Sequence, residues 1–327
     1  MPLDQYQREI NYLRISVTDH CNLRCVYCMP LNGLKFLPQE DLLTPSEIAA
    51  VVGVAVEAGF RKFRLTGGEP TLRTDLVEIV ERINRIEGVG DLAMTTNGIL
   101  LPTLAAPLAR AGLRRVNIHI DTLNPERLGR IMRWGKLDEI SKGIEAAEAA
   151  GLVPIKLNAV IARGYNDEDV VSLARLTMER DWHFRFIEMM PFGIGECAAL
   201  VRDQFVSNAE VRERIERELG ELTPLTGELS DESKNYRLPG ARGVVGFISP
   251  VSEPYCGSCN RMRLTADGKF HLCLLNDDEM EVKRQLRENG PAAVRDILLK
   301  AVRLKPVGHH LDQGIHTRNR KMFQIGG

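Results

Sequence analysis

Short apolar runs alternate with longer segments of helical periodicity over the first two thirds of the chain. The short runs are rich in β-branched residues, as strands are, and the longer segments repeat their apolar positions every three or four residues, as helices do. The predicted strands are Leu13–Val17, Phe63–Thr66, Leu92–Thr95, Val116–Ile120, Ile155–Val160 and Phe184–Glu188. The predicted helices are Pro45–Ala58, Thr74–Ile86, Thr103–Ala111, Leu137–Ala150, Glu168–Arg180 and Asn208–Leu219. Such alternation predicts an α/β fold in which helices cover a parallel sheet.

The alternation stops near residue 220. Residues 222–243 are rich in polar and turn-forming residues, Val244–Ile248 has the pattern of one more strand, and the chain after Cys256 is rich in loops. We therefore expect a barrel-like domain over residues 1–219 and a C-terminal extension over residues 220–327.

Several predicted strands carry one polar or charged side chain among apolar neighbours: Arg64, Lys156, Arg185, Asn117 and His119. Parallel strands covered on both faces are normally continuous apolar runs, and a cation is not left unpaired in a dry core. Each cation alone could be paired with a carboxylate or lie on an edge strand. Three of them in three strands favour an open six-stranded barrel with a cation-lined interior, because a closed eight-stranded barrel fills its interior with side chains.

The bulk composition excludes some functions. Of the 327 residues, 44% are hydrophobic and 27% charged, and the net charge is −1, so no overall positive field directs the protein to nucleic acid or to an anionic membrane. Residues 1–9 lack the apolar core of a signal peptide, and the apolar stretch Ile48–Phe60 is too short to span a bilayer. These features predict a cytoplasmic protein, in which the seven cysteines are metal ligands or buried thiols rather than disulfides.

Three cysteines in the pattern C-x-x-x-C-x-x-C follow the first predicted strand, at Cys21, Cys25 and Cys28. Three thiolates on one loop can hold three irons of a cubane cluster, which four cysteines normally hold, and leave the fourth iron open for chemistry. A redox C-x-x-C pair or half of a zinc site is the alternative. Redox pairs use two cysteines and zinc prefers four ligands, so the pattern favours a catalytic iron–sulfur cluster.

The segment Thr66-Gly67-Gly68-Glu69-Pro70 follows the next predicted strand. Glycines at this place allow the backbone to approach a ligand closely, and Glu69 could bind an ammonium group or only cap a turn. The chain has no G-x-x-x-x-G-K-[ST] sequence, so we do not expect a nucleotide that is hydrolysed in a P-loop.

A second cysteine set, Cys256, Cys259 and Cys273, lies in the predicted extension, and His271 could complete a zinc site with it. Between these cysteines, Arg261 and Arg263 flank Met262 and share one side of an extended segment. Guanidinium groups bind phosphate in a bidentate manner, although the two arginines could also form a solvated strand face.

Two features stand apart from these motifs. Cys197 has no partner pattern and is predicted to be a buried thiol or an additional ligand. The chain ends in Gly326-Gly327, a terminus slim enough to enter a cavity, and a frayed end is the alternative. We expect this tail to enter the cavity and to help place the substrate or cofactor.

Taken in order, these motifs resemble the GTP 3′,8-cyclase family of molybdenum cofactor biosynthesis, within the radical S-adenosylmethionine (SAM) superfamily. The matching motifs are C-x-x-x-C-x-x-C, T-G-G-E-P-T-L-R, M-T-T-N-G, D-T-L, K-L-N, R-F-I-E-M-M, C-x-x-C-N-R-M-R-L-T and the terminal G-G. The first two identify only the superfamily, whereas the C-terminal cysteines with N-R-M-R and the G-G tail identify the cyclases. The resemblance implies an incomplete (β/α)6 TIM-like barrel with a C-terminal extension, SAM, and two [4Fe–4S] clusters at opposite ends of one cavity.

The resemblance also implies roles for individual residues. The first cluster is implied at Cys21, Cys25 and Cys28, and the second at Cys256, Cys259 and Cys273. The implied cofactor-binding residues are Tyr27, Gly67, Gly68, Glu69, His119 and Met190. The implied GTP-binding residues are Arg14, Arg64, Thr95, Lys156, Arg185, Arg261, Met262, Arg263, Gly326 and Gly327, and catalysis is implied for Arg14, Arg261, Arg263 and the first cysteine set. One position departs from the family pattern, because His119 stands where many relatives have serine.

The implied reaction is that of a radical SAM lyase, which cleaves SAM to methionine and 5′-deoxyadenosine and converts GTP into (8S)-3′,8-cyclo-7,8-dihydroguanosine 5′-triphosphate. The implied partners are a flavodoxin- or ferredoxin-like electron donor and the downstream cyclic pyranopterin monophosphate synthase, and the implied assembly is a homodimer or a monomer. An alternative is a radical SAM enzyme with an auxiliary cluster that modifies a peptide or another small molecule. The sequence also leaves open an iron–sulfur carrier, a nucleotide sensor and a zinc protein.

Overall fold

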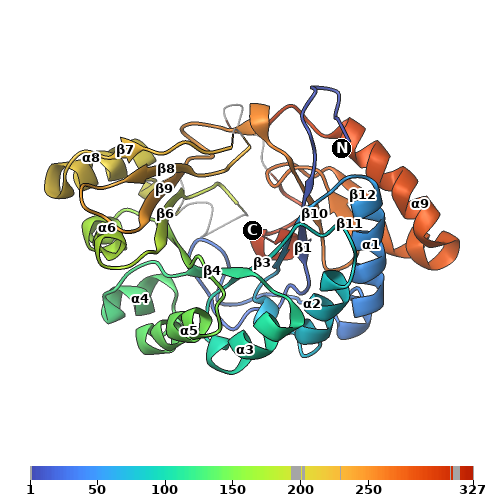
Figure 1. Ribbon diagram of the computed structural model, residues 1–327, viewed down its shortest axis with the longest axis horizontal. Coiled ribbons are helices and arrows are strands. Elements are labelled where there is room, and N and C mark those ends of the chain that lie inside the picture. Colours follow the sequence, from blue (N-terminus) through green and yellow to red (C-terminus); the bar gives the residue numbers. More distant parts are fainter. Residues whose placement is uncertain are drawn as a thin grey trace.

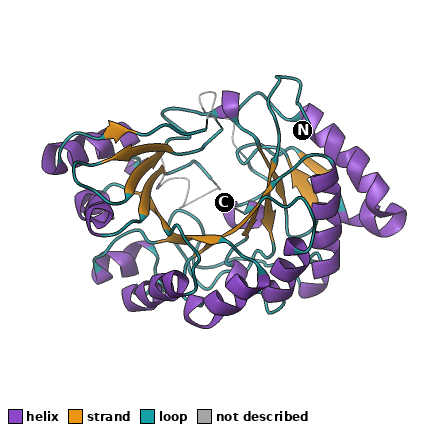
Figure 2. Ribbon diagram, in the orientation of Figure 1, coloured by secondary structure: helices purple, strands orange, loops and turns teal. Residues whose placement is uncertain are grey.

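The computed structural model describes residues 2–192, 200, 203–228, 230–309, 311 and 317–326. Twelve strands of these residues form one sheet in the order β12-β11-β10-β1-β2-β3-β4-β5-β6-β9-β8-β7. The sheet curves into an arc, and helices cover its outer face (Figures 1 and 2). The incomplete barrel predicted from the sequence is therefore confirmed.

The predicted strands and helices of the barrel are confirmed, with each end lying within two residues of its predicted position. The strands are β1 (Tyr12–Ser16), β2 (Lys62–Thr66), β3 (Asp91–Thr96), β4 (Arg115–His119), β5 (Lys156–Ile161), β6 (His183–Glu188), β7 (Thr223–Pro224), β8 (Lys234–Arg237), β9 (Val244–Ile248), β10 (Arg261–Leu264), β11 (Lys269–His271) and β12 (Glu279–Glu281). The helices are α1 (Pro45–Glu57), α2 (Leu76–Asn84), α3 (Leu101–Ala111), α4 (Pro125–Ile131), α5 (Leu137–Ala149), α6 (Val170–Glu179), α8 (Asn208–Leu219), α9 (Lys283–Leu304) and α10 (Met322–Ile325).

The C-terminal third of the chain extends both edges of the barrel sheet. Strands β1 to β6 run parallel in chain order, and the later strands β10 and β9 pair parallel with β1 and β6 respectively. Antiparallel strands β11 and β12 continue the sheet beyond β10, and β8 and β7 continue it beyond β9. The division of the chain between residues 219 and 220 stays a prediction.

The chain after Cys256 contains more regular structure than the loop-rich segment that we expected. Helix α9 lies on α1 at the outside of the barrel (Figure 1). Its helical dihedrals break only at Gly290, where φ is 73°, and Pro291 follows. A Gly-Pro pair predicts a helix end, so the sequence pattern hid a helix that resumes after a single break.

Local sequence signals explain why the helices start and stop where they do. Thr44 begins α1 with a capping box, because its hydroxyl accepts from the Glu47 backbone N–H while the Glu47 carboxylate accepts from the Thr44 N–H. Gly112 ends α3 with a φ of 108°, a left-handed conformation that glycine adopts without steric cost. No helix among the described residues is long and apolar enough to cross a bilayer.

The register of the sheet places a row of arginines on the inner face of the barrel. Leu13 and Ile15 of β1 are buried in the hydrophobic core, so Arg14 between them points to the opposite, inner face. Arg14 lies directly beside Arg64 of β2 and Arg263 of β10. Three guanidinium groups from neighbouring strands therefore meet at one level of the barrel, and all three side chains are buried.

Candidate active site

A cavity of about 280 Å³ lies inside the barrel, and both cysteine sets line it. The topology places these two sets at opposite ends. Cys21 comes after the C-terminal end of β1, whereas Cys259 comes just before the N-terminal end of β10, and β1 and β10 are parallel and in register. Cys273 follows β11, which is antiparallel to β10, so Cys273 returns to the end where Cys259 lies. The arginine row lies between the two ends.

The first cysteine loop is a compact turn. The backbone N–H groups of Cys28 and Met29 both donate to the carbonyl of Cys25, and Arg24 donates to the carbonyl of Cys21 (2.8 Å). The Arg24 guanidinium lies over the rings of Phe36 and Trp134, which fixes the loop from outside.

The cysteines of the first set form no disulfide, and burial raises the pKa of Cys21 to about 11 and that of Cys25 well above its ordinary value. Thiols in such surroundings are deprotonated by a bound metal rather than by solvent. Three thiols on one cavity wall therefore fit the three-thiolate ligation of a [4Fe–4S] cluster.

The G-G-E-P segment packs backbone against backbone on the chain that leads into the cysteine loop. The Gly68 N–H donates to the Thr18 carbonyl (2.8 Å), and the Glu69 N–H donates to the His20 carbonyl (2.7 Å). A Cβ atom on Gly68 would lie 2.3 Å from the His20 carbonyl oxygen. Gly67 and Gly68 both line the cavity, so they serve this close chain packing and also form part of the cavity wall.

Glu69 is buried and its carboxylate is fully engaged. One oxygen accepts from the backbone and hydroxyl of Thr71 and from the hydroxyl of Thr96 (2.7 Å), and the other accepts from the Asn97 N–H (2.7 Å). Burial raises the pKa of Glu69, and these hydrogen bonds act in the opposite direction. The sequence left open whether Glu69 caps a turn or binds an ammonium group. The structure shows the cap, and Glu69 also lines the cavity, where it can attract a cation.

Tyr27 and His119 share a buried carboxylate that the sequence analysis did not single out. The Tyr27 hydroxyl donates to Asp121 (2.8 Å) and lies 2.5 Å from His119 Nε2, which itself lies 2.9 Å from Asp121. Burial lowers the pKa of His119, but the charge of Asp121 and its hydrogen bond to the imidazole together outweigh burial and raise the pKa. Asp121 thus fixes His119 at the cavity wall.

Two cations from other parts of the chain, Arg8 and Lys305, lie close to the second cysteine set. Arg8 donates to the carbonyls of Cys256 (2.7 Å), Pro306 (2.6 Å) and Val307 (2.9 Å), and the carboxylate of Asp4 holds Arg8 in place. The buried Lys305 donates to the Leu272 carbonyl (2.8 Å), and its charge acts on the thiols of Cys259 and Cys273. Free thiols beside a buried ammonium fit a negatively charged thiolate-bound cluster.

The zinc alternative receives no support from the geometry. Among the described residues, no group of three His, Cys, Asp or Glu side chains lies close enough to hold a single metal ion. His271 does not line the cavity, and burial lowers the pKa of its imidazole to about 4. Cys197, which the sequence offered as an extra ligand, lies outside the described residues.

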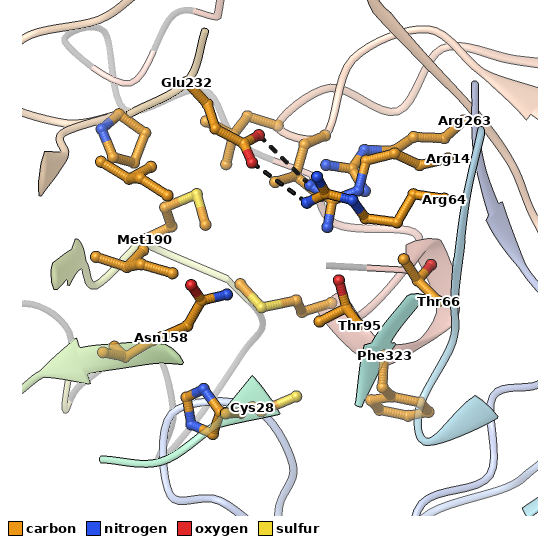
Figure 3. A pocket seen from close by; sticks show the side chains of 18 of the residues that line it. Arg14, Cys28, Arg64, Thr66, Thr95, Asn158, Met190, Glu232, Arg263 and Phe323 are labelled. Atoms are coloured by element: carbon orange, nitrogen blue, oxygen red, sulfur yellow. Dashed lines mark hydrogen bonds and ion pairs between the residues drawn. The ribbon is translucent and has the colours of Figure 1, made fainter. Parts of the chain in front are cut away.

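Arginines from four strands face one carboxylate, Glu232, at the middle of the barrel, and Figure 3 shows Arg14 and Arg64 opposite it. Glu232 lies 3.4 Å from Arg64, 3.5 Å from Arg261, 3.8 Å from Arg14 and 4.0 Å from Arg185. With its amide turned to accept, Asn117 receives hydrogen bonds from Arg64 (2.8 Å) and Arg185 (3.0 Å). Asn117 thus fixes two of the arginines. Four guanidinium groups surround one carboxylate, so the cluster has a net positive charge.

The predicted GTP-binding residues do not all lie in the main cavity. Arg14, Arg64, Thr95, Arg261 and Arg263 line it. Lys156 and Arg185 line a second cavity of about 120 Å³ at the N-terminal ends of the strands. Burial and the charges of nearby arginines lower the pKa of Lys156 to about 8.

Among the predicted GTP-binding residues, Met262 lies apart from both cavities. Its side chain is fully buried in the hydrophobic core and lines neither cavity, because it alternates with Arg261 and Arg263 along β10. The side chain of Met262 therefore faces away from both cavities. Met190 lines the main cavity (Figure 3).

The C-terminal segment lies against the inner wall of the barrel, whereas entry of the Gly-Gly tail into the cavity stays a prediction, because Gly326 is not among the residues that line the cavity. Figure 1 shows the short red helix α10 near the centre of the arc of strands. Arg263 donates to the carbonyl of Gly326, which is buried with a φ of 76° against Ser16 and Thr66. Met322 and Phe323 line the cavity, and Gly327 lies outside the described residues.

Comparisons with known proteins agree with this geometry. Residues 15–177 match the sequence profile of the radical SAM superfamily, and residues 182–311 match the profile described as Molybdenum Cofactor Synthesis C. The chain is 48% identical over 326 residues to a GTP 3′,8-cyclase of Pelotomaculum thermopropionicum, with 99% of each chain covered. It is 46% identical over 326 residues to a GTP 3′,8-cyclase of Moorella thermoacetica, again with 99% of each covered.

Among solved structures, the chain resembles SuiB of Streptococcus suis with a TM-score of 0.64 over 89% of this chain and 67% of that chain. At 14% identity this similarity concerns the fold alone. The partial barrel and its first cysteine loop define a member of the radical SAM superfamily. Within that superfamily, the chain belongs to the GTP 3′,8-cyclase family.

Proposed function

We propose that this chain converts GTP into (8S)-3′,8-cyclo-7,8-dihydroguanosine 5′-triphosphate, the first step of molybdenum cofactor biosynthesis. The observation that carries the proposal is the arrangement of two three-cysteine sets at opposite ends of a cavity that arginines line between them. An electron carrier has no use for such a cavity, since it closes each cluster with four ligands.

Cys21, Cys25 and Cys28 would hold the [4Fe–4S] cluster that binds SAM, and Cys256, Cys259 and Cys273 would hold a second one. Bound there, these groups supply the radical chemistry of the reaction, and the protein supplies binding, orientation and exclusion of water. Glu69 and His119 lie at the wall near the first cysteine set and orient the amino acid and adenosine parts of SAM. Lys305 balances the charge near the second set.

The arginine cluster matches the charge of the substrate. A triphosphate carries several negative charges, and Arg14, Arg64 and Arg263 can bind it through charge-assisted hydrogen bonds at one level of the barrel. The second cavity, with Lys156 and Arg185, extends this positive surface toward the N-terminal ends of the strands. The guanine ring would then point to the second cysteine set and the ribose to the middle of the cavity.

Further proposals concern the cellular context. We place the enzyme in the cytoplasm, as a homodimer or a monomer, with a flavodoxin- or ferredoxin-like protein as electron donor. Cyclic pyranopterin monophosphate synthase would consume the product. Neither nucleic acid nor a membrane is proposed as a partner, in line with the net charge of −1.

The test is anaerobic incubation of the reconstituted protein with GTP, SAM and dithionite, followed by mass analysis of the nucleotide. The product is an isomer of GTP and has the same mass, because the hydrogen atom lost from C3′ is replaced by one electron and one proton. The proposal therefore expects a nucleotide of unchanged mass that separates from GTP in chromatography, together with an equal amount of 5′-deoxyadenosine. A protein in which Cys21 is replaced by alanine serves as the control and forms neither. SAM cleavage without any change in GTP would instead favour the alternative substrate, a peptide or another small molecule.

A further inference from the structure

Glu232 stands where an anionic ligand would be expected. It is an acidic side chain at the focus of a cluster whose other members are all cations, and only 14% of the side chain is exposed. Figure 3 shows its carboxylate pointing from the opposite side of the cavity toward Arg14 and Arg64. Its residue comes from the turn-rich segment before β8, not from the barrel strands that carry the arginines.

The Glu232 carboxylate is ionised, but its distances to the arginines are long for charge-assisted hydrogen bonds. Burial alone would raise the pKa of Glu232, but four guanidinium groups outweigh burial and keep the pKa well below its ordinary value. Its distances to those groups run from 3.4 to 4.0 Å, whereas charge-assisted N–H···O bonds are about 2.7–2.9 Å long. Glu232 therefore balances charge here without making the short bonds that a well-fitted ligand would make.

The arginines are not fully compensated by this one carboxylate. The Nε atoms of Arg64 and Arg261 are buried and have no hydrogen-bond partner among the described residues. Burial acts to lower the pKa of Arg64 and Arg261, but nearby acidic groups, Glu232 among them, outweigh burial and raise it. Burial instead lowers the pKa of Arg185 to about 10 and that of Arg263 to about 9, so these two cations have too little opposite charge nearby. A buried polar group without a hydrogen-bond partner destabilises the protein. Further acceptor oxygens, such as those of a phosphate, would therefore stabilise the cluster.

Glu232 also lies at the boundary between the two cavities. Glu232, Arg64 and Arg261 each line both the main cavity and the second cavity. A phosphate chain that runs from the arginine row toward Lys156 therefore meets guanidinium groups that Glu232 already faces, and it competes with this carboxylate for them. Two anions cannot share one position there, because like charges in close contact repel strongly in a poorly solvated site.

We propose that the Glu232 carboxylate occupies a phosphate position among the arginines as a built-in competitor, which the substrate must displace. This inference rests on the proposed function, since it takes the arginine cluster as the triphosphate site. The free energy needed to displace the Glu232 carboxylate is the same for every phosphate ligand that reaches the cluster. A chain of three phosphates regains that cost through contacts with several guanidinium groups, whereas a single phosphate contacts too few. Glu232 thereby excludes short phosphate compounds at concentrations where a triphosphate binds.

The probe that isolates this effect is inorganic tripolyphosphate, because it lacks the guanine and ribose. Its affinity is measured by calorimetry on the anaerobically reconstituted protein without SAM. Glu232→Gln keeps the size of the side chain and removes its charge, so the variant should bind tripolyphosphate about tenfold more tightly or better. The control is Glu253→Gln, which removes a carboxylate from the exposed Glu253–Lys234 pair and should leave the affinity within about twofold of wild type.

A second readout is the rise in melting temperature that tripolyphosphate causes. A purely structural role of Glu232 would not make this rise larger in the variant than in wild type. Without phosphate, Glu232→Gln should melt below wild type, because its arginines lose their counter-ion. Tripolyphosphate should raise the melting temperature of the variant more than that of wild type, since a ligand stabilises the state that it binds. If the Gln variant does not fold, Glu232→Asp is used instead. Its side chain is one methylene shorter, so the carboxylate keeps its charge but lies farther from the arginines. This variant should also bind tripolyphosphate more tightly than wild type.

Equal or weaker tripolyphosphate binding by Glu232→Gln, or by Glu232→Asp when only that variant folds, would overturn the inference. It would show that Glu232 orders the arginines for the ligand instead of competing with it. GTP conversion by wild type is measured in parallel. A protein that fails to convert GTP, but whose Glu232→Gln variant gains tripolyphosphate affinity, contradicts the proposed function and leaves the role of Glu232 intact.

Discussion

Replacement of Gly326 by alanine tests whether the buried C-terminal tail takes part in the reaction. Gly326 has a φ of 76°, and a Cβ atom there would lie 2.1 Å from the Thr66 hydroxyl oxygen and 3.3 Å from Ser16 Cβ. The left-handed conformation costs an L-residue roughly 1–2 kcal/mol, and overpacking of a filled site costs about 1–3 kcal/mol more.

The tail can escape this penalty by leaving its site. The bond from Arg263 to the Gly326 carbonyl is the polar contact that holds the last described residue, and a hydrogen bond to a charged group contributes about 1.5–3 kcal/mol. Because the penalty matches or exceeds this contribution, we expect the end of the chain to lift out while Phe323 and Ile325 stay buried. Arg263 then loses its fixed position, and turnover should fall about 10- to 100-fold at saturating GTP.

The assay pairs initial rates of product formation with hydrogen exchange of the C-terminal peptide. Gly326→Ala should exchange faster in that peptide and should melt close to wild type. Gly240→Ala is the matched control, because Gly240 has a φ of 70° but no atom within 4 Å of an added Cβ. It should lose about 1 kcal/mol of stability and no activity. Wild-type turnover in Gly326→Ala, with faster exchange of the tail, would refute a role for the tail in the reaction.

Three other predictions follow from the same geometry. Arg8→Ala removes the donor that ties Cys256 to residues 306–307, so anaerobically bound iron should fall toward half of the wild-type content, and full content would contradict this. Glu69→Gln places an N–H₂ group against donors and should lower stability by about 1–3 kcal/mol and weaken SAM binding, as melting and equilibrium dialysis would measure. Lys156, with a pKa of about 8, loses its charge as the pH rises through that value, so the KM for GTP should increase between pH 7 and pH 9. Lys156→Arg keeps the charge and should give a flat profile over the same range, and an equally steep profile in that variant would refute the assignment.

Features encoded by local spacing could be predicted from the sequence. The strands and helices of the barrel follow from hydrophobic periodicity, and the two cysteine sets follow from short motifs. The lone cations in the strands also indicated a charged interior, because a dry parallel sheet has no place for them. Arg64 confirms this reasoning, since it lies on the inner face beside Arg14, a cation that the reasoning did not include.

Features that depend on contacts between residues far apart in the sequence could not be predicted from it. Glu232 is 168 residues from Arg64, and Arg8 is 248 residues from Cys256, so no periodicity links them. Lys305 lies at the end of a helix that a Gly-Pro pair concealed. The strands that complete the sheet are short and pair across the chain, with β10 beside β1.

The iron and sulfide content of cysteine variants tests the central claim, two clusters that three cysteines each hold across one cavity. Anaerobically reconstituted wild type should contain about eight iron and eight sulfide per chain. Replacing Cys21, Cys25 and Cys28 together, or Cys256, Cys259 and Cys273 together, should leave about four of each. About four of each in wild type, or wild-type content after loss of either set, would contradict the account.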